Sequence, residues 1–345
     1  MNSIGKISKQ NGRINRRQFL QIVAVTGVAG LTLKVGLDRL NELETIQESR
    51  LLMGTVVNLT VITSNANQGR LAVSACLDRM QGLEEVLSRF KRGSQLSQLN
   101  LNGRIKNANS ALLELIEQSQ SLGYLSGGAF DITIKPLVDL YAAYEQQGKG
   151  LPPKEEVERL RQRVDYHQIH LVGEEVSFAM PGMAITLDGI AKGYIVDQGI
   201  STLRQFGFEN VLVEAGGDLS ASGEKAPDAP WRIGIQSPRK AMGQILTRLQ
   251  VADQAIATSG DYMHTFTADF TEHHILDPRT GYSSPELASV TVIAPTCALA
   301  DGLATAMMVL GVDSGFALLE SLENCQATLV KKDGEIVTSD NLRLG

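Results

Sequence analysis

Residues 288–310 have the sequence ASVTVIAPTCALADGLATAMMVL, and the fold assignment depends on this stretch. Its first part, Ala288 to Ile293, is rich in β-branched residues and predicts a strand. Its second part, Ala298 to Leu310, is apolar along almost its whole length and predicts a helix. We therefore expect helices that pack against a sheet.

The same analysis extends to the rest of the chain. Leu52 to Ile62 predicts a strand, Val73 to Phe90 a helix with apolar residues three and four apart, and Ser94 to Asn100 a polar loop. Further helices are predicted from Ser110, from Pro152-Pro153 to Arg163 and over 191–206, with strands within 166–188, near 211–215, 231–236 and 246–257, and a hairpin at Lys332-Asp333-Gly334. Because strands and helices do not alternate strictly, we expect an α+β fold with mixed or antiparallel sheets rather than a doubly wound parallel one.

Length and composition narrow the class of protein. The chain has 345 residues, and 43% of them are hydrophobic, which is enough for a large core. Its net charge of −6 argues against binding to nucleic acid through bulk charge. The three cysteines form no Cys-x-x-Cys pair, so a zinc ribbon and a thioredoxin-type motif are excluded.

The N-terminal residues are typical of an export signal. Five basic residues and no acidic one lie in 1–18, and Arg16-Arg17 stands just before the apolar run Phe19 to Leu33. We interpret 1–36 as a twin-arginine signal, 37–50 as a linker and 51–345 as the folded region, in which two intertwined subdomains remain an option. A periplasmic location follows, and membrane attachment through an uncleaved signal stays open because no Ala-x-Ala site is evident.

Five segments combine glycine with ionisable or polar residues near predicted strand ends. They are 128–131 (GAFD), 188–194 (DGIAKGY), 214–218 (EAGGD), 257–262 (ATSGDY) and 274–281 (HILDPRTG). Glycine lets backbone N–H groups approach a ligand closely, and clusters of such groups favour anions. Together the segments indicate a ligand with several polar parts, such as a nucleotide with a pyrophosphate.

The apolar helix also carries two oxygen ligands. Asp301 and Thr305 are four residues apart, so they lie on one helix face. A carboxylate and a hydroxyl in such a position suit Mg²⁺. The alternative is that Asp301 binds no metal and is an ordinary residue near the helix N-terminus, where the helix dipole stabilises its negative charge.

These segments, in this order, resemble the ApbE family of FAD:protein FMN transferases. The resemblance covers about residues 50–335 and includes further matches at Met53-Gly54-Thr55, Ser88-Arg89-Phe90 and the Ser94, Ser97 and Asn100 positions. It implies an ApbE-like, T-fold-related architecture. It also implies a Mg²⁺-dependent enzyme that cleaves FAD, transfers FMN to a threonine of a partner subunit in a membrane redox complex, and releases AMP. An FAD pyrophosphatase and a non-catalytic flavin-binding protein are the alternatives.

The resemblance also assigns residues. The resemblance implies that the metal ligands are Asp301, Thr305 and the backbone carbonyl of Gly189. The positions implied at the FAD are Met53, Phe90, Ala129, Phe130, Asp131, Thr186, Lys192, His274 and Ile275. Lys192 would neutralise charge on the pyrophosphate, and either His274 or Asp261 would accept the threonine proton. The chain departs from the family pattern at Thr186-Leu187-Asp188, where Asp-Leu-Gly is usual, and at Glu214, where Asn is frequent.

Overall fold

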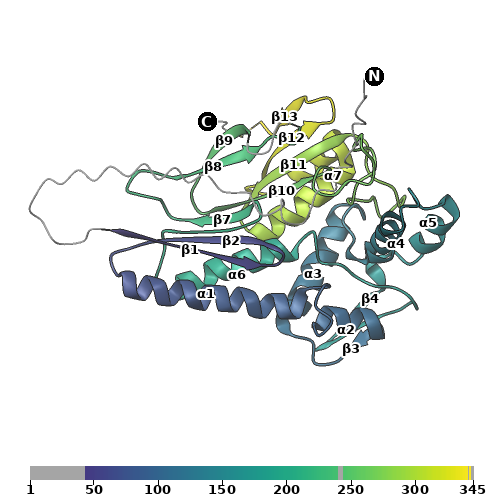
Figure 1. Ribbon diagram of the computed structural model, residues 1–345, viewed down its shortest axis with the longest axis horizontal. Helices are drawn as coiled ribbons and strands as arrows, with labels where there is room; N and C mark the ends of the chain where they lie inside the picture. The colour runs from purple at the N-terminus through teal and green to yellow at the C-terminus, as the bar shows by residue number, and fades with distance from the viewer. Residues whose placement is uncertain (1–42, 240–243, 341, 343–345) are drawn as a thin grey trace, which may run out of the picture.

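A large antiparallel sheet forms the centre of the computed structural model, which describes residues 43–239, 244–340 and 342 (Figure 1). Within these residues the order of its strands is β1-β2-β6-β7-β10-β11-β12-β13, and every neighbouring pair is antiparallel. The strands are β1 (Glu44–Leu52), β2 (Thr55–Thr63), β6 (Val211–Ala215), β7 (Asp218–Ser222), β10 (Gln254–Gly260), β11 (Leu287–Ala294), β12 (Gln326–Lys331) and β13 (Ile336–Thr338). The predicted signal 1–36 lies outside the described residues.

Three long helices cover one face of this sheet. They are α1 (Ala66–Leu87), α6 (Ala191–Gln205) and α7 (Cys297–Glu320). Their apolar side chains and the inward-facing residues of the strands form the main hydrophobic core. Close packing needs small residues here: a Cβ at Gly199 of α6 would lie 3.2 Å from the sulfur atoms of Cys76 and Met80 on α1.

The opposite face is covered by a hairpin of β8 (Trp231–Gln236) and β9 (Ile245–Val251). Trp231 is buried there against a second, smaller core, which includes Leu212 and Leu219 from the large sheet. The large sheet is therefore covered on both faces over much of its width.

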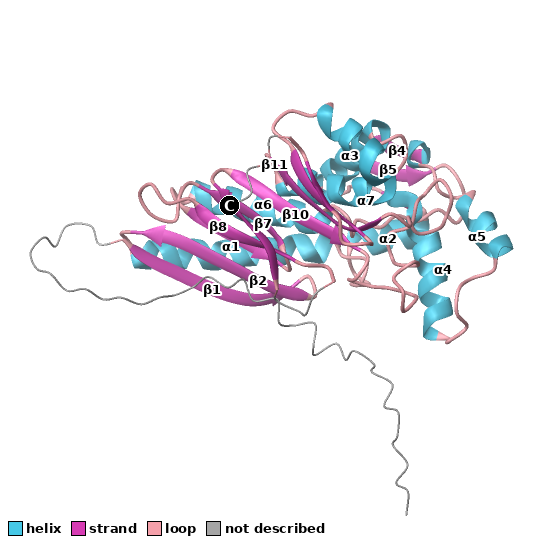
Figure 2. Cartoon of the chain, turned by 90° about the horizontal axis from the view of Figure 1, so that it is seen from above, coloured by secondary structure: helices cyan, strands magenta, loops and turns pink. Residues whose placement is uncertain are grey.

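The remaining elements form a mainly helical part at one end of the molecule (Figure 2). The helices are α2 (Gln95–Asn102), α3 (Ser110–Leu125), α4 (Lys135–Gln146) and α5 (Lys154–Arg161), with the 3₁₀ turns η2 (Ile132–Ile134) and η3 (Tyr166–Gln168). A small antiparallel sheet has the order β3-β5-β4, from β3 (Arg104–Ile105), β4 (Ile169–Val172) and β5 (Glu175–Phe178).

Several predictions of local structure were wrong. The part of the predicted linker from Glu44 onward is strand β1, which pairs with β2 along its whole length but is mostly exposed, so its sequence is polar. The predicted loop from Ser94 is helix α2, whose Leu96 and Leu99 are buried on one side. The strand predicted over 246–257 is two strands, β9 and β10, separated by a turn at Asp253, whose φ is +52°.

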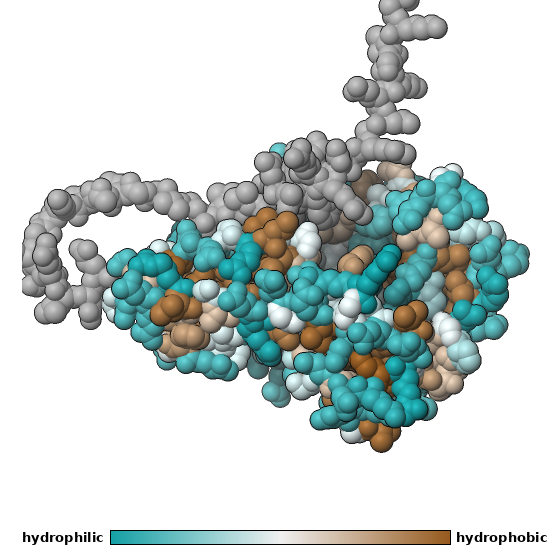
Figure 3. Space-filling view, turned by 60° about the horizontal axis from the view of Figure 1, so that its bottom comes forward, coloured by the Kyte–Doolittle hydropathy of each residue, from teal (hydrophilic) through white to brown (hydrophobic). Residues whose placement is uncertain are grey.

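The predicted α+β class with antiparallel sheets is confirmed. Helix α7 is long and apolar enough to cross a membrane, but 61% of its most apolar window is buried, as expected for the central helix of a globular core. On the face shown in Figure 3, hydrophobic side chains form small groups among hydrophilic ones rather than one broad band.

Candidate active site

Asp301 lies in the second turn of α7 and is buried, with 5% of its surface exposed. Its Oδ2 accepts a hydrogen bond of 3.1 Å from the backbone N–H of Gly193, in the first turn of α6. Burial raises the pKa of the Asp301 carboxyl, and the ammonium of Lys192 opposes this effect. Asp301 therefore joins the N-terminal turns of two core helices.

Thr305 lies one turn further along α7. Its Oγ1 is 3.1 Å from Oγ of Ser259, at the end of β10. A Cβ at Gly189 would lie 3.0 Å from the same Oγ1, so the Gly189 backbone passes directly against the hydroxyl of Thr305. The structure thus brings the three predicted metal ligands together and adds Ser259, which the sequence analysis missed although it lies in the ATSGDY segment.

This donor set consists of oxygen atoms. Among the described residues there is no group of three or more His, Cys, Asp or Glu side chains that could hold a metal ion. One carboxylate, one hydroxyl and one backbone carbonyl would suit a hard cation such as Mg²⁺, which keeps several waters or substrate oxygens as further ligands. The residues present therefore fit Mg²⁺ better than a transition metal, for which imidazole or thiolate ligands are typical.

Lys192 at the start of α6 makes an ion pair with Asp218, whose side chain is buried at the start of β7. The other oxygen of Asp218 accepts from the N–H of Thr258 at 3.3 Å. In this ion pair with Asp218, the ammonium of Lys192 lies close enough to Asp301 to lower the pKa of the Asp301 carboxyl. Asp218 was not predicted as a site residue, although it ends the glycine-rich EAGGD segment.

Glu214 supports the turn before Asp218. Its two oxygens accept from Nδ2 of Asn58 at 2.5 Å and from the N–H of Gly217 at 2.7 Å. Burial raises the pKa of this carboxyl. The departure from the family pattern at this position therefore has a local structural role: Glu214 fixes the glycine turn.

The segment from Ala129 to Asp131 is buried. The ring of Phe130 would lie 3.3 Å from a Cβ at Gly189, so Phe130 forms a wall of the site. Asp131 points into the protein, where one oxygen accepts from both Thr133 N–H and hydroxyl and the other from Tyr166 N–H. Burial raises its pKa to about 6. The carboxylate of Asp131 thus stabilises the local backbone conformation through Thr133 and Tyr166.

Two predicted FAD residues lie in turns. Met53 has a φ of +54° in the two-residue turn between β1 and β2, where the following Gly54 has a φ of +73°. Phe90 is 76% exposed, outside helix α1, and the guanidinium of Arg89 lies 4.2 Å from its ring centroid. The predicted helix over 73–90 thus ends earlier, at Leu87.

Asp188 also contacts Arg89. Its Oδ2 accepts from Nε of Arg89 at 2.6 Å. Its carboxylate is one of the groups that raise the pKa of Asp301. Thr186, which is buried, accepts from the N–H of Asp188 at 3.2 Å. Thr186 therefore fixes the backbone just before the Gly189 carbonyl.

The two candidate bases differ in their surroundings. Asp261 is fully buried, and both its oxygens are bound by Arg239, at 2.7 and 2.6 Å. His274, next to the buried Ile275, has Nδ1 3.0 Å from the backbone oxygen of His264, and burial lowers its pKa to about 4. His274 is therefore neutral near pH 7, with Nε2 free of any protein partner in the described part of the chain. The two candidates thus differ in access to a proton: both oxygens of Asp261 are engaged by Arg239, whereas one ring nitrogen of His274 is not engaged by any described residue.

The structure does not bring every predicted residue into direct contact. Within the described residues, no hydrogen bond or ion pair joins His274 to Asp301 or to Thr305. The loop that carries His274 begins directly after β10, however, two residues beyond Ser259. A substrate that reaches from the α7 oxygens to this loop would link the two groups.

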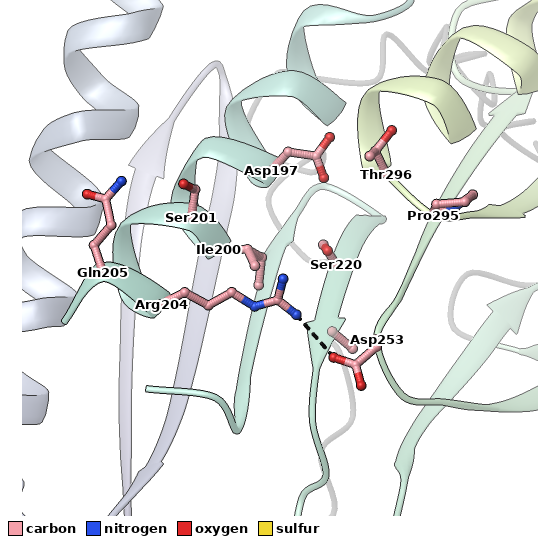
Figure 4. A pocket seen from close by; sticks show the side chains of 10 residues that line it. Asp197, Ile200, Ser201, Arg204, Gln205, Ser220, Asp253, Pro295 and Thr296 are labelled. Atoms are coloured by element: carbon pink, nitrogen blue, oxygen red, sulfur yellow. Dashed lines mark hydrogen bonds and ion pairs between the residues drawn. The ribbon is translucent and has the colours of Figure 1, made fainter. Parts of the chain in front are cut away.

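A separate cavity of about 470 Å³ lies beside α6 near the first residues of α7 (Figure 4). Asp197 lines it and caps α7 by accepting from the N–H groups of Cys297 and Ala298, at 2.8 and 2.9 Å. Arg204 crosses the cavity wall and pairs with Asp253 at 3.1 Å. None of the predicted site residues lines this cavity.

Known proteins are similar to this chain in both sequence and fold. The ApbE family model matches residues 53–329. The FAD:protein FMN transferase of Vibrio cholerae is 32% identical over 317 residues, which cover 90% of this chain and 94% of that protein. The solved flavin transferase ApbE from Vibrio cholerae superposes with a TM-score of 0.74 at 29% identity, over 87% of this chain and 98% of that one. The ApbE protein of Thermotoga maritima superposes with a TM-score of 0.77 at 29% identity, over 86% and 97%. The match spans the α7 oxygens, the glycine-rich segments and most of the central sheet, and the chain therefore belongs to the ApbE family.

Proposed function

We propose that this chain is an FAD:protein FMN transferase that moves FMN from FAD to a threonine hydroxyl of an acceptor protein and releases AMP. Membership of the ApbE family and the names of the similar proteins support the transferase activity. The observation that carries the proposal is the buried Asp301 carboxylate one helical turn before Thr305, whose hydroxyl lies against the backbone of Gly189. A buried carboxylate in an apolar helix is costly unless hydrogen bonds and positive charge compensate it; the N–H of Gly193 and the ammonium of Lys192 do so in part, and a bound cationic group would complete the compensation.

We propose Mg²⁺ as that group. Asp301, Thr305 and the carbonyl of Gly189 would hold it, and when bound it would neutralise charge on the pyrophosphate oxygens of FAD. Lys192 contributes a second positive charge close to Asp301. The aromatic wall of Phe130 excludes water from one side of the site.

The group transfer requires one proton to move. The threonine oxygen forms a bond to the phosphorus of the FMN half, and the bond from that phosphorus to the bridging oxygen breaks. AMP leaves with the bridging oxygen. The hydroxyl proton goes to Nε2 of His274, which carries the ring's lone pair because Nδ1 faces the backbone oxygen of His264 at 3.0 Å.

The acceptor and the location are part of the same proposal. The Arg16-Arg17 pair before an apolar run supports export by the twin-arginine route, which carries folded proteins. We propose a periplasmic enzyme, free or attached through an uncleaved signal, that acts on a subunit of a membrane redox complex.

The test is to replace Asp301 with alanine. Wild-type protein and Asp301→Ala are incubated with FAD, Mg²⁺ and a threonine-containing acceptor domain, and the acceptor mass is measured over time. We expect the rate of FMN addition to fall by about 100-fold or more, since a bound metal supplies several kcal/mol of transition-state stabilisation. Asp313→Ala, an exposed carboxylate on the same helix, is the matched control and keeps the wild-type rate.

Two results would contradict the proposal. A wild-type transfer rate in Asp301→Ala at saturating Mg²⁺ would remove the metal-ligand role. Release of FMN and AMP by wild-type protein, with no mass added to any acceptor, would make the chain an FAD pyrophosphatase instead.

A further inference from the structure

The segment between β10 and β11, residues 261–286, carries His274 and folds back on itself. An isolated bridge pairs Thr265 with His273, and Phe266 N–H donates to Glu272 O at 2.8 Å. His264 and His274 therefore face one another across the two arms of this segment. A segment of this length without helix or sheet is typically functional.

The backbone oxygen of His264 makes two contacts with His274. It accepts from the backbone N–H of His274 at 3.0 Å and lies 3.0 Å from Nδ1 of the same residue. A carbonyl oxygen can only accept a hydrogen bond, so in the neutral ring the proton resides on Nδ1 and the lone pair on Nε2. The position of this one carbonyl therefore sets both the tautomer and the orientation of His274.

The side chain of His264 is fixed by helix α4. Its Nε2 is 2.8 Å from Oε2 of Glu145, and its ring meets Phe266 edge-on at 5.2 Å between centroids. Phe266 in turn stacks at 5.2 Å on Tyr141, one turn before Glu145 on the same helix. The hydroxyl of Tyr141 donates to the carbonyl of Gly281 at 3.0 Å, beyond His274 in the chain. Helix α4 thus holds the segment on both sides of His274.

We propose that Glu145 and His264 are positioning residues for FMN transfer: their contact fixes the carbonyl that orients His274 and keeps its Nε2 free to accept the threonine proton. This inference rests on the proposed role of His274 as the base. The side chains of Glu145 and His264 are 44% and 49% exposed. Contacts this exposed contribute little to the stability of the fold, so their loss leaves the protein folded.

The experiment combines transfer kinetics with nitrogen NMR of labelled histidines. Glu145→Ala and His264→Ala should lower kcat for FMN transfer by about 10- to 100-fold, with little change in KM for FAD, because misplacement of a catalytic group affects the reaction step. In both variants the nitrogen shifts of His274 should move from the Nδ1–H tautomer toward a mixture. Glu145→Gln keeps a side-chain oxygen that can accept a hydrogen bond from His264. This variant should therefore retain most of the wild-type kcat for FMN transfer.

Controls separate this inference from the proposed function. Gln146→Ala changes the adjacent exposed residue of α4 and should leave rate and spectrum unchanged. The NMR measurement requires no activity, so it tests the orientation of His274 independently of the proposed function. Normal FMN transfer by His274→Ala would remove His274 as the base, and it would therefore overturn this inference as well. Wild-type kcat in both alanine variants, or a loss of kcat with no change in the His274 spectrum, would also overturn it.

Discussion

Arg239 and Asp261 form a buried ion pair at the start of the segment that carries His274. Arg239→Met leaves the fully buried Asp261 carboxylate with Lys332, at 3.9 Å, as its one remaining cationic partner among the described residues. We expect the free energy of unfolding, measured with urea, to fall by about 3–5 kcal/mol, because removal of one partner strands a buried charge. Adding Asp261→Asn should recover part of this loss.

The control for this prediction is Arg248→Met, which changes an exposed arginine on β9 and should shift stability by less than about 0.5 kcal/mol. A loss below about 1 kcal/mol in Arg239→Met would mean that water or another side chain compensates Asp261.

Single residues differed in how well the sequence could predict their roles. Asp301 and Thr305 could be paired because helix geometry fixes the relation between residues four apart. Ser259 and His264 could not be placed, because their contacts depend on how distant segments meet. The pairing of Asp261 with Arg239 could not be predicted for the same reason: the two residues are 22 positions apart in the chain, and no local pattern indicates the pair.

Helix α7 changes direction at Gly311, which has φ +78° and ψ −169°. A Cβ at this position would lie 2.0 Å from Oε2 of Glu286. We expect Gly311→Ala to lower the free energy of unfolding by about 1–3 kcal/mol, because this backbone region is almost restricted to glycine. In a Glu286→Ala background the collision is removed, so any remaining loss measures the backbone conformation alone.

Gly315→Ala is the matched control for the bend. Gly315 lies on the same helix with helical geometry, and a Cβ there would make an ordinary contact of 3.4 Å with Met307. Alanine should be neutral or slightly stabilising at this position. Equal stability of Gly311→Ala and Gly315→Ala would show that α7 can straighten without cost.

Elements were predictable where one side of them is buried. The strand at 211–215 and the helix at 191–206 have clear apolar patterns, and both were confirmed. Strand β1 is exposed along most of its length and therefore has the polar composition of a linker. Helix α2 is only eight residues long, so its two buried leucines gave too short a pattern to recognise.

For the whole molecule, we expect export to depend on the arginine pair. Arg16→Lys combined with Arg17→Lys should keep the protein in the cytoplasm of a bacterial host, because the twin-arginine route recognises both residues. Cell extracts should retain full transfer activity, since these residues precede the folded region. Immunoblots of periplasmic and cytoplasmic fractions measure the effect.

Arg13→Lys provides the control, because it keeps the charge and lies before the pair. Equal periplasmic amounts of the double variant and of Arg13→Lys would remove the assignment of a twin-arginine signal.

The strand order of the central sheet also determines when the fold can be completed. Strands β2 and β6 are neighbours, yet residues 64–210 separate them in the chain. During synthesis, β1, β2 and α1 can form a local unit early, but the edge of β2 stays unpaired until β6 has left the ribosome. Helix α7 packs mainly on α6, β10 and β11, which precede it in the chain, but β12, near the C-terminus, is still needed to pair with β11 and complete the core. The entropic cost of closing a loop grows only slowly with its length. The long separation of β2 and β6 therefore delays completion of the sheet but costs the folded protein little stability. A chain truncated anywhere before β12 would expose core surface, and it would therefore be a substrate for quality-control proteases.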